Sequence, residues 1–140
     1  MTVSANFPVV SLGYEPVDHD HHNFVALIEA LNQADNVAFP TLFSRLLAHT
    51  EQHFELENQL MESSGFPAHG EHRSEHQRVL GEFKQFKLRV DKGLVAFGRS
   101  FLRDRVVPWF KLHVVTMDSA LIAHLHSQQG QQHLKLAGMR

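Results

Sequence analysis

Cysteine is absent from this sequence of 140 residues. Its absence excludes disulfide bridges, thiolate zinc sites, iron–sulfur clusters and a cysteine nucleophile. Long apolar runs are absent too: nowhere do about 18 apolar residues follow one another, so we expect no membrane-spanning segment. Residues 1–12 lack the basic start and apolar stretch of a secretory signal, and we therefore expect a cytoplasmic location.

Charged residues make up only 20% of the chain and apolar residues 43%, a composition typical of one globular domain. Residues 1–70 hold nine of the 15 acidic side chains but only one of the 13 basic ones. This asymmetry fits packed helices with complementary faces better than a nucleic-acid surface, because no reading motif accompanies the basic residues. We expect no nucleic-acid or membrane partner, and the oligomeric state stays open.

Glycine, proline and polar clusters divide the chain near residues 36–40, 63–70 and 92–98. Between these breaks the apolar residues recur every three to four positions, which is typical of α-helices, and no strand-like alternation is sustained. The predicted stripes contain Phe24, Val25, Ile28 and Leu31, then Leu42, Leu46, Thr50, Phe54 and Met61, then Val79, Leu80, Phe83, Phe86 and Val90, and a fourth apolar helix over about residues 94–125. Four helices joined by short loops predict an all-α fold, an up-down-up-down antiparallel four-helix bundle.

We expect a single domain over residues 1–140, with an extended N-terminal arm (1–16), the bundle (17–125) and a short, loosely held tail (126–140). Pro108 lies within the fourth predicted helix. Because proline has no N–H and leaves the Asp104 carbonyl without its partner, we predict a kink at this position.

Histidine is unusually abundant, with twelve residues in 140. His53 and Glu57 are four positions apart on the second predicted helix, and His72 and His76 are four apart on the third. Residues at this spacing point from the same side of a helix, so each pair can converge on one ion. Candidate metal ligands occur on inward faces of all four helices, and they are His21, His53, Glu57, His72, His76, His113 and Asp118.

Any one of these pairs is weak evidence for a metal, and the prediction depends on their conjunction. Without a metal, neighbouring helices would bury polar groups that lack partners, at about 1–3 kcal/mol each. The pattern therefore predicts a metal site in the bundle core. His113 and Asp118 are five positions apart, about 140° around an ideal helix, so spacing alone does not pair them.

The order His, His-x-x-x-Glu, His-x-x-x-His and His-x-x-x-x-Asp across residues 18–118 resembles the hemerythrin family, in particular its bacteriohemerythrin-like members with an HHE cation-binding di-iron domain. Neighbouring residues are similar as well: Asp18 before the first ligand, Phe54 after the second, the Gly65–Phe66–Pro67 turn, and Trp109–Phe110 before His113.

The resemblance implies two iron ions (Fe²⁺/Fe³⁺) joined by an oxo or hydroxo bridge. His72, His76 and His113 would bind one iron, His21 and His53 the other, while Glu57 and Asp118 would bridge the two. These ligands fill all but one position of two six-coordinate ions. The open position is on the iron with two histidines, where dioxygen would bind. We further expect an apolar oxygen pocket, formed by Phe24, Phe54, Trp109 and Phe110.

The function that the resemblance implies is reversible dioxygen binding, as an oxygen carrier or store, and no catalytic residue is assigned. An oxygen or redox sensor and a peroxide or nitric oxide reductase at the same irons are the alternatives. Manganese or zinc in place of iron also stays open. The sequence departs from the family pattern at Asp20, where Gln is frequent, and at Tyr14, where the arm often has Trp. Asp20, adjacent to His21, is expected to affect access to the site or the hydrogen bonding around its ligands.

Residues 72–76 also match His-x-x-Glu-His, the inverted zinc-protease motif, in which Glu75 would be the base. This hypothesis is disfavoured because it leaves His21, His53, Glu57 and His113 unexplained. His49 lies one turn before His53 and is expected outside the ligand set, in a supporting or surface position. The remaining histidines are expected at the surface: His19, His22, His69, His124, His126 and His133.

Overall fold

The computed structural model describes residues 11–138, with side chains described as far as Gln128. Every regular element in this part of the chain is a helix. The elements are α1 (Glu15–Gln33), α2 (Phe39–Ser64), α3 (His69–Asp91), α4 (Val95–Phe101), η1 (Leu102–Val106), α5 (Val107–His113), η2 (Val114–Asp118) and α6 (Ser119–Gly138). The last five follow one another without a break, and here we call them the fourth rod.

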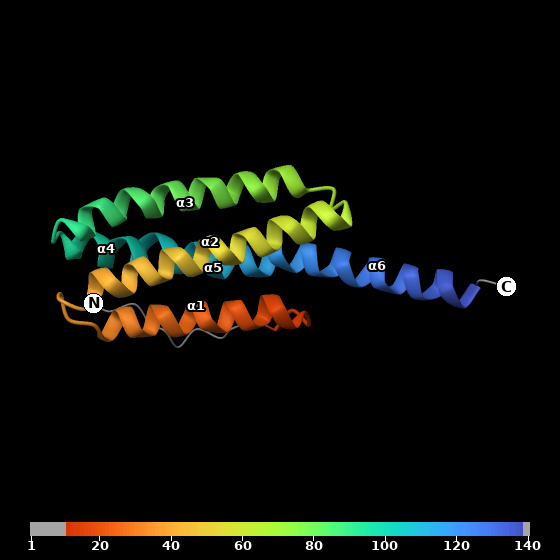
Figure 1. Cartoon of the computed structure of the whole chain (residues 1–140), viewed down its shortest axis with the longest axis horizontal. Coiled ribbons are helices and arrows are strands. Elements are labelled where there is room, and N and C mark those ends of the chain that lie inside the picture. The colour runs from red at the N-terminus through yellow and green to blue at the C-terminus, as the bar shows by residue number, and fades with distance from the viewer. Residues whose placement is uncertain (1–10, 139–140) are drawn as a thin grey trace.

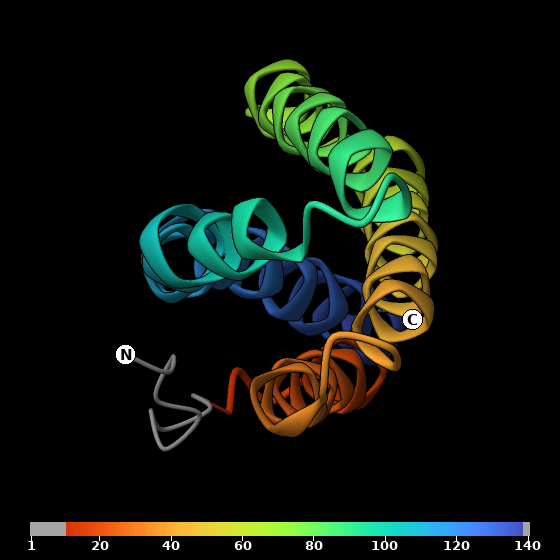
Figure 2. The same cartoon turned by 90° about the vertical axis from the view of Figure 1, so that its left-hand side faces the viewer.

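The four rods lie side by side along the long axis, and the view from one end shows them as separate cylinders (Figures 1 and 2). Helix α2 packs against α1 and α3, and α3 also packs against α4. Consecutive rods are joined by a few residues, so neighbours run antiparallel. The predicted all-α, up-down-up-down four-helix bundle is confirmed.

The second and third turns are shorter than the predicted breaks, the first is displaced towards the N-terminus, and the first two have local causes. Before α2, the Asp35 carboxylate accepts the N–H groups of Val37 (3.1 Å) and Ala38 (2.8 Å). Helix α2 ends at Gly65, whose φ of +66° is a left-handed conformation that glycine adopts without a steric penalty. Such turns return the chain at once, which aligns the rods over most of their length.

Asp18 holds the start of the described chain against α1. Its carboxylate, which is buried, accepts the N–H groups of Leu12 (2.8 Å) and Gly13 (3.1 Å) and the hydroxyl of Ser11 (3.2 Å). Helix α1 begins at Glu15, within the region predicted as an arm (1–16), and residues 1–10 of that arm lie outside the described residues.

Apolar side chains form two buried clusters, one towards each end of the bundle. The larger contains most of the predicted stripes, including Phe24, Ile28, Leu46 and Phe83. The smaller consists of Val17, Met61, Leu121, Ile122 and Leu125. His21, Glu57 and Asp118 each fall between a residue of the larger cluster and one of the smaller cluster along their helices. His53 and His113 directly precede Phe54 and Val114 of the larger cluster, so the candidate ligands form a polar layer enclosed by apolar packing.

Pro108 lies in the first turn of α5, directly after the π-helical segment η1, and the kink expected at this residue stays a prediction. At the C-terminal end of η1 the Val107 N–H bonds the Leu102 carbonyl, five residues back instead of four. The predicted tail (126–140) is helical in its described part, because α6 continues to Gly138. The segment Val95–Gln128 is long and apolar enough to cross a membrane by length and composition alone. The buried core helix of a bundle meets the same two criteria.

Candidate metal centre

The structure brings all seven predicted ligands together in the polar layer, and none is more than 7% exposed. All four rods contribute to this layer. Helix α1 provides one ligand, α2 two, α3 two and the fourth rod two, in the order His21; His53 and Glu57; His72 and His76; His113 and Asp118.

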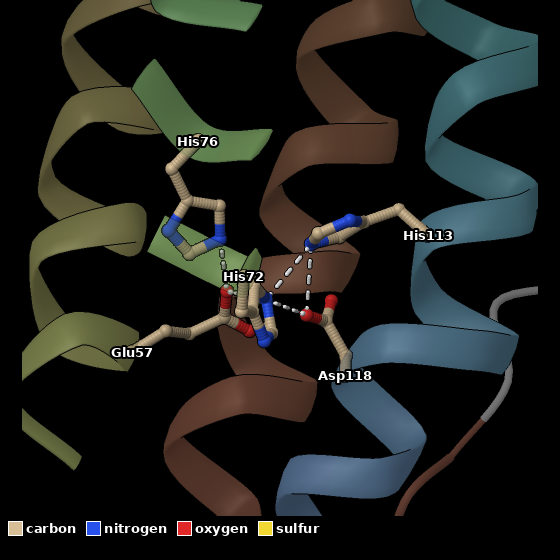
Figure 3. Close-up of side chains that lie close together, drawn as sticks. All are labelled: Glu57, His72, His76, His113 and Asp118. Carbon is tan, nitrogen blue, oxygen red and sulfur yellow. Dashed lines mark hydrogen bonds and ion pairs between the residues drawn. The ribbon is translucent and has the colours of Figure 1, made fainter. Parts of the chain in front are cut away.

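The ligands divide into two groups that share both carboxylates. One group joins Glu57 and Asp118 with three histidines, and Figure 3 shows these five side chains converging from α2, α3 and the fourth rod. The other joins the same carboxylates with His21 and His53. Within each group the nearest ligand atoms lie within 4.8 Å of one another. We call these groups the three-histidine half (His72, His76, His113) and the two-histidine half (His21, His53).

Glu57 faces both halves, with one oxygen towards each. Its Oε1 lies 3.0 Å from His76 Nε2 and 3.5 Å from His72 Nε2, whereas Oε2 lies 3.2 Å from His53 Nε2. Because the two oxygens of one carboxylate point to different groups of imidazoles, Glu57 can span two metal ions.

Asp118 repeats this arrangement from the opposite side. Its Oδ1 lies 3.1 Å from His72 Nε2 and 3.0 Å from His113 Nε2, and its Oδ2 lies 3.0 Å from His21 Nε2. Together with Glu57 it forms a pair of carboxylates between the halves.

The π-helical segment η2, Val114–Asp118, explains how His113 and Asp118 meet although five positions separate them. A π-helix places bonded partners five residues apart, so one turn takes in one more residue than in an α-helix. The extra residue returns Asp118 to the side of His113, and His113 Nε2 lies 3.0 Å from Asp118 Oδ1.

Hydrogen-bond acceptors face one another inside the layer. His53 Nδ1 donates to Asp20 Oδ2 and His76 Nδ1 donates to Asn58 Oδ1, both at 3.0 Å. A neutral imidazole that donates through Nδ1 presents a lone pair at Nε2. In both residues this lone pair points at an oxygen of Glu57, at 3.2 Å and 3.0 Å. Such contacts require a positive charge between the atoms, either a proton or a metal ion.

Several buried atoms of the layer also lack any hydrogen-bond partner. They include His21 Nε2, His53 Nε2, His76 Nε2, Asp118 Oδ1 and both oxygens of Glu57. Each of these atoms can offer a lone pair to a cation once any proton on it is displaced, and imidazole with carboxylate is a donor set that suits iron. The residues therefore fit the two metal ions that the sequence suggested.

The electrostatics of the layer favour positive charge. Burial disfavours the imidazolium form of His53, but the Glu57 carboxylate and the hydrogen bond to Asp20 outweigh it and raise its pKa to about 10. Burial likewise opposes the charging of His72, yet the carboxylates of Asp118 and Glu57, whose oxygens lie 3.1 Å and 3.5 Å from its Nε2, raise its pKa to about 9. Burial would raise the pKa of Glu57, but His53 and the other imidazoles hold it well below its usual range.

A small cavity of about 10 Å³, room for about one water-sized molecule, opens beside the layer. The predicted pocket residues Phe24, Phe54, Trp109 and Phe110 all line it, together with His49 and Thr50. Both histidines of the two-histidine half reach the cavity, whereas His113 is the one member of the other half that does. The cavity therefore lies on the side of the layer that has fewer imidazoles.

Other predictions about histidine and Glu75 have mixed outcomes. Glu75 lies outside the layer, where it accepts the Trp109 indole N–H (2.7 Å) and pairs with Arg78, so the geometry gives no support to a protease base. His49 lines the cavity and bonds the Asp20 carbonyl at 3.0 Å. His19, His22 and His126 are exposed as expected, His69 and His124 are half-buried, contrary to expectation, and the His133 side chain lies outside the described ones.

Sequence reasoning missed Asn58, which orients His76. A polar residue directly after a ligand carries little signal, because that position on a helix is usually solvent-facing.

Inside this four-helix bundle, two carboxylates are shared by a group of three imidazoles and a group of two imidazoles. This arrangement defines a candidate dinuclear metal centre. A family model described as the hemerythrin HHE cation binding domain matches residues 12–125. The chain belongs to the hemerythrin family.

Known proteins that this chain resembles are bacteriohemerythrins. The one from Ralstonia nicotianae is 34% identical over 119 residues, 85% of each chain. The one from Aquifex aeolicus is 33% identical over 101 residues, 71% of this chain and 76% of the relative. A more distant one from Pseudomonas aeruginosa is 24% identical over 88 residues, 60% of this chain and 58% of the relative. No solved structure matches the chain.

Proposed function

We propose that this protein holds two iron ions in the polar layer and binds dioxygen reversibly, as a carrier or store. The three-histidine half would hold one ion and the two-histidine half the other, with Glu57 and Asp118 spanning both. Membership of a cation-binding family and the mixed imidazole and carboxylate ligands support iron.

The position of the cavity is the observation that carries the proposal. Both halves share the same two carboxylates, so the two-histidine half has one protein ligand fewer. The cavity adjoins His21 and His53, and three phenylalanines and one tryptophan surround it. An ion held by His21, His53 and the two carboxylates would have room for a further ligand, and a small apolar space beside these residues suits a diatomic ligand better than a larger substrate.

Two ferrous ions, when bound, supply the electrons that dioxygen takes up. Reversibility then depends on the chain keeping other protons away from the cavity. The polar lining groups outside the ligand set have their hydrogens engaged elsewhere: the Thr50 hydroxyl donates to the Leu46 carbonyl (2.7 Å), His49 donates to the Asp20 carbonyl (3.0 Å), and the Trp109 indole donates to Glu75 (2.7 Å). Phe24 and Phe110, stacked at 4.3 Å, exclude water on another side.

The test is the visible spectrum of protein loaded with iron under anaerobic conditions, recorded before oxygen is admitted, with oxygen present, and after its removal. We expect a charge-transfer band that appears with oxygen and disappears when oxygen is removed. His53→Ala should lower iron uptake and abolish the band, whereas His22→Ala, at an exposed position, should change neither. A permanent ferric spectrum after the first exposure would refute reversible binding.

A further inference from the structure

Two imidazoles of the polar layer each donate a hydrogen bond from Nδ1, the nitrogen that faces away from the carboxylates, to another side chain. The two accepting side chains differ in charge. His53 Nδ1 donates to the carboxylate of Asp20, and His76 Nδ1 donates to the amide of Asn58, each at 3.0 Å. His53 belongs to the two-histidine half and His76 to the three-histidine half. The Nδ1 atoms of the other three histidines have no hydrogen-bond partner in the described part of the chain; these histidines are His21, His72 and His113.

Asp20 is held firmly in this position. Its carboxylate is 24% exposed, and its backbone carbonyl accepts a hydrogen bond from His49 Nε2 at 3.0 Å. Helix α2 therefore contacts Asp20 at two points, through His49 and His53. The Asp20 carboxylate is partly open to solvent, and an aspartate is ordinarily ionised at neutral pH.

A carboxylate and an amide do not orient an imidazole equally. An ionised carboxylate can only accept hydrogen bonds, so His53 must carry its hydrogen on Nδ1 and present the Nε2 lone pair to the layer. An amide accepts through oxygen and donates through nitrogen, so Asn58 specifies the His76 tautomer less strictly. Only the carboxylate adds negative charge, which makes the imidazole a stronger donor to a cation.

We propose that Asp20 is the positioning residue of the two-histidine half, and that its charge makes this half bind a cation more tightly and favour a higher oxidation state. The proposal rests on the proposed function, since it concerns metal ions in the polar layer. The asymmetry between Asp20 and Asn58 thus adds charge to the half that adjoins the cavity.

Zinc is the probe for the first test, because it binds imidazole and carboxylate without redox chemistry. Wild-type protein is titrated with Zn²⁺ alongside Asp20→Asn and Asp20→Ala. Asp20→Asn keeps the size and a hydrogen-bond acceptor but removes the charge. Mutation of a residue that hydrogen-bonds a metal ligand typically lowers metal affinity about 10–100-fold. We therefore expect Asp20→Asn to lower the affinity for one of the two zinc ions about 10-fold, and Asp20→Ala to lower it further.

The midpoint potential of the iron-loaded protein separates charge from packing, with Asn58→Asp as the matched variant. Asp20→Asn should raise the potential, and Asn58→Asp, which adds a carboxylate behind His76, should lower it. A residue that only filled space would not produce opposite shifts.

The outcomes are distinguishable. Wild-type protein that binds two zinc ions but shows no selective loss in either Asp20 variant, or equal loss at both sites, overturns the role of Asp20 alone. Potentials that move in the same direction in Asp20→Asn and Asn58→Asp also overturn it. Wild-type protein that takes up neither metal overturns the proposed function together with this inference.

Discussion

Metal binding to the polar layer should release protons, because two of its histidines have raised pKa values. His53 and His72 have pKa values of about 10 and about 9, against 6.5 for a free imidazole. Both should therefore be imidazolium ions, protonated on both ring nitrogens, at pH 7.5 in the metal-free protein. A metal ligand must be a neutral imidazole, so filling both halves has to displace these protons. We expect a release of about two protons per chain.

The assay is a titration with Zn²⁺ in weakly buffered solution at pH 7.5, followed with a pH indicator. Exposed His22 supplies the control, because His22→Ala should leave the proton count unchanged. A release well below one proton per chain, with two zinc ions bound, would refute the reasoning, since it would mean that the carboxylates do not hold the imidazoles protonated.

The same two pKa values set the sign of a stability change. Because they are raised above the unfolded value, their contribution to the free energy of unfolding is complete below about pH 6.5. It is lost as the pH rises through about 9 and 10. Urea denaturation of metal-free protein at pH 7 and pH 10 should therefore show lower stability at pH 10, and equal stability would contradict the assignment.

Three further predictions concern packing. Gly98→Ala should lower the free energy of unfolding in urea by about 1–3 kcal/mol, because the added Cβ would lie 2.5 Å from a neighbouring valine methyl. Gly81→Ala, where the added Cβ has no neighbour within 4 Å, should instead stabilise α3 by about 0.5–1 kcal/mol. Asp18→Asn should lower the free energy of unfolding by about 1–3 kcal/mol. Burial raises the Asp18 pKa, but backbone N–H groups outweigh it and lower the pKa, so the wild-type contribution should be present above about pH 4 and fade as the pH falls. If Asp18→Asn and the wild type lose thermal stability equally as the pH falls below 4, this reasoning is refuted. Phe54→Ala should cost about 3–5 kcal/mol, while Phe97→Ala, 47% exposed, should cost far less; similar losses would contradict the packing described.

Spacing along the sequence was enough to predict the bundle and two ligand pairs. His53 with Glu57, and His72 with His76, lie one α-helical turn apart, and that geometry depends only on local backbone hydrogen bonds. The apolar stripes follow from the same periodicity. These features were predictable because neighbours on one helix need no information from the others.

His113 and Asp118 could be paired only through the family resemblance. Their five-residue separation fits a π-helical turn, and nothing in residues 114–118 shows that η2 replaces a regular α-helical turn there. Pro108 predicted a kink, but not the π-helical segment η1 that lies directly before α5. Helix α6 likewise extends through residues that were predicted to form a loosely held tail.

The sequence by itself thus determined which residues share a helix face, because the α-helical repeat is set locally. Only the tertiary structure decided which Glu57 oxygen faces which half, that Asp20 and Asn58 support different imidazoles, and that the cavity opens beside His21 and His53. These relations depend on the rotation and stagger of four rods, which the packing of all their side chains sets together.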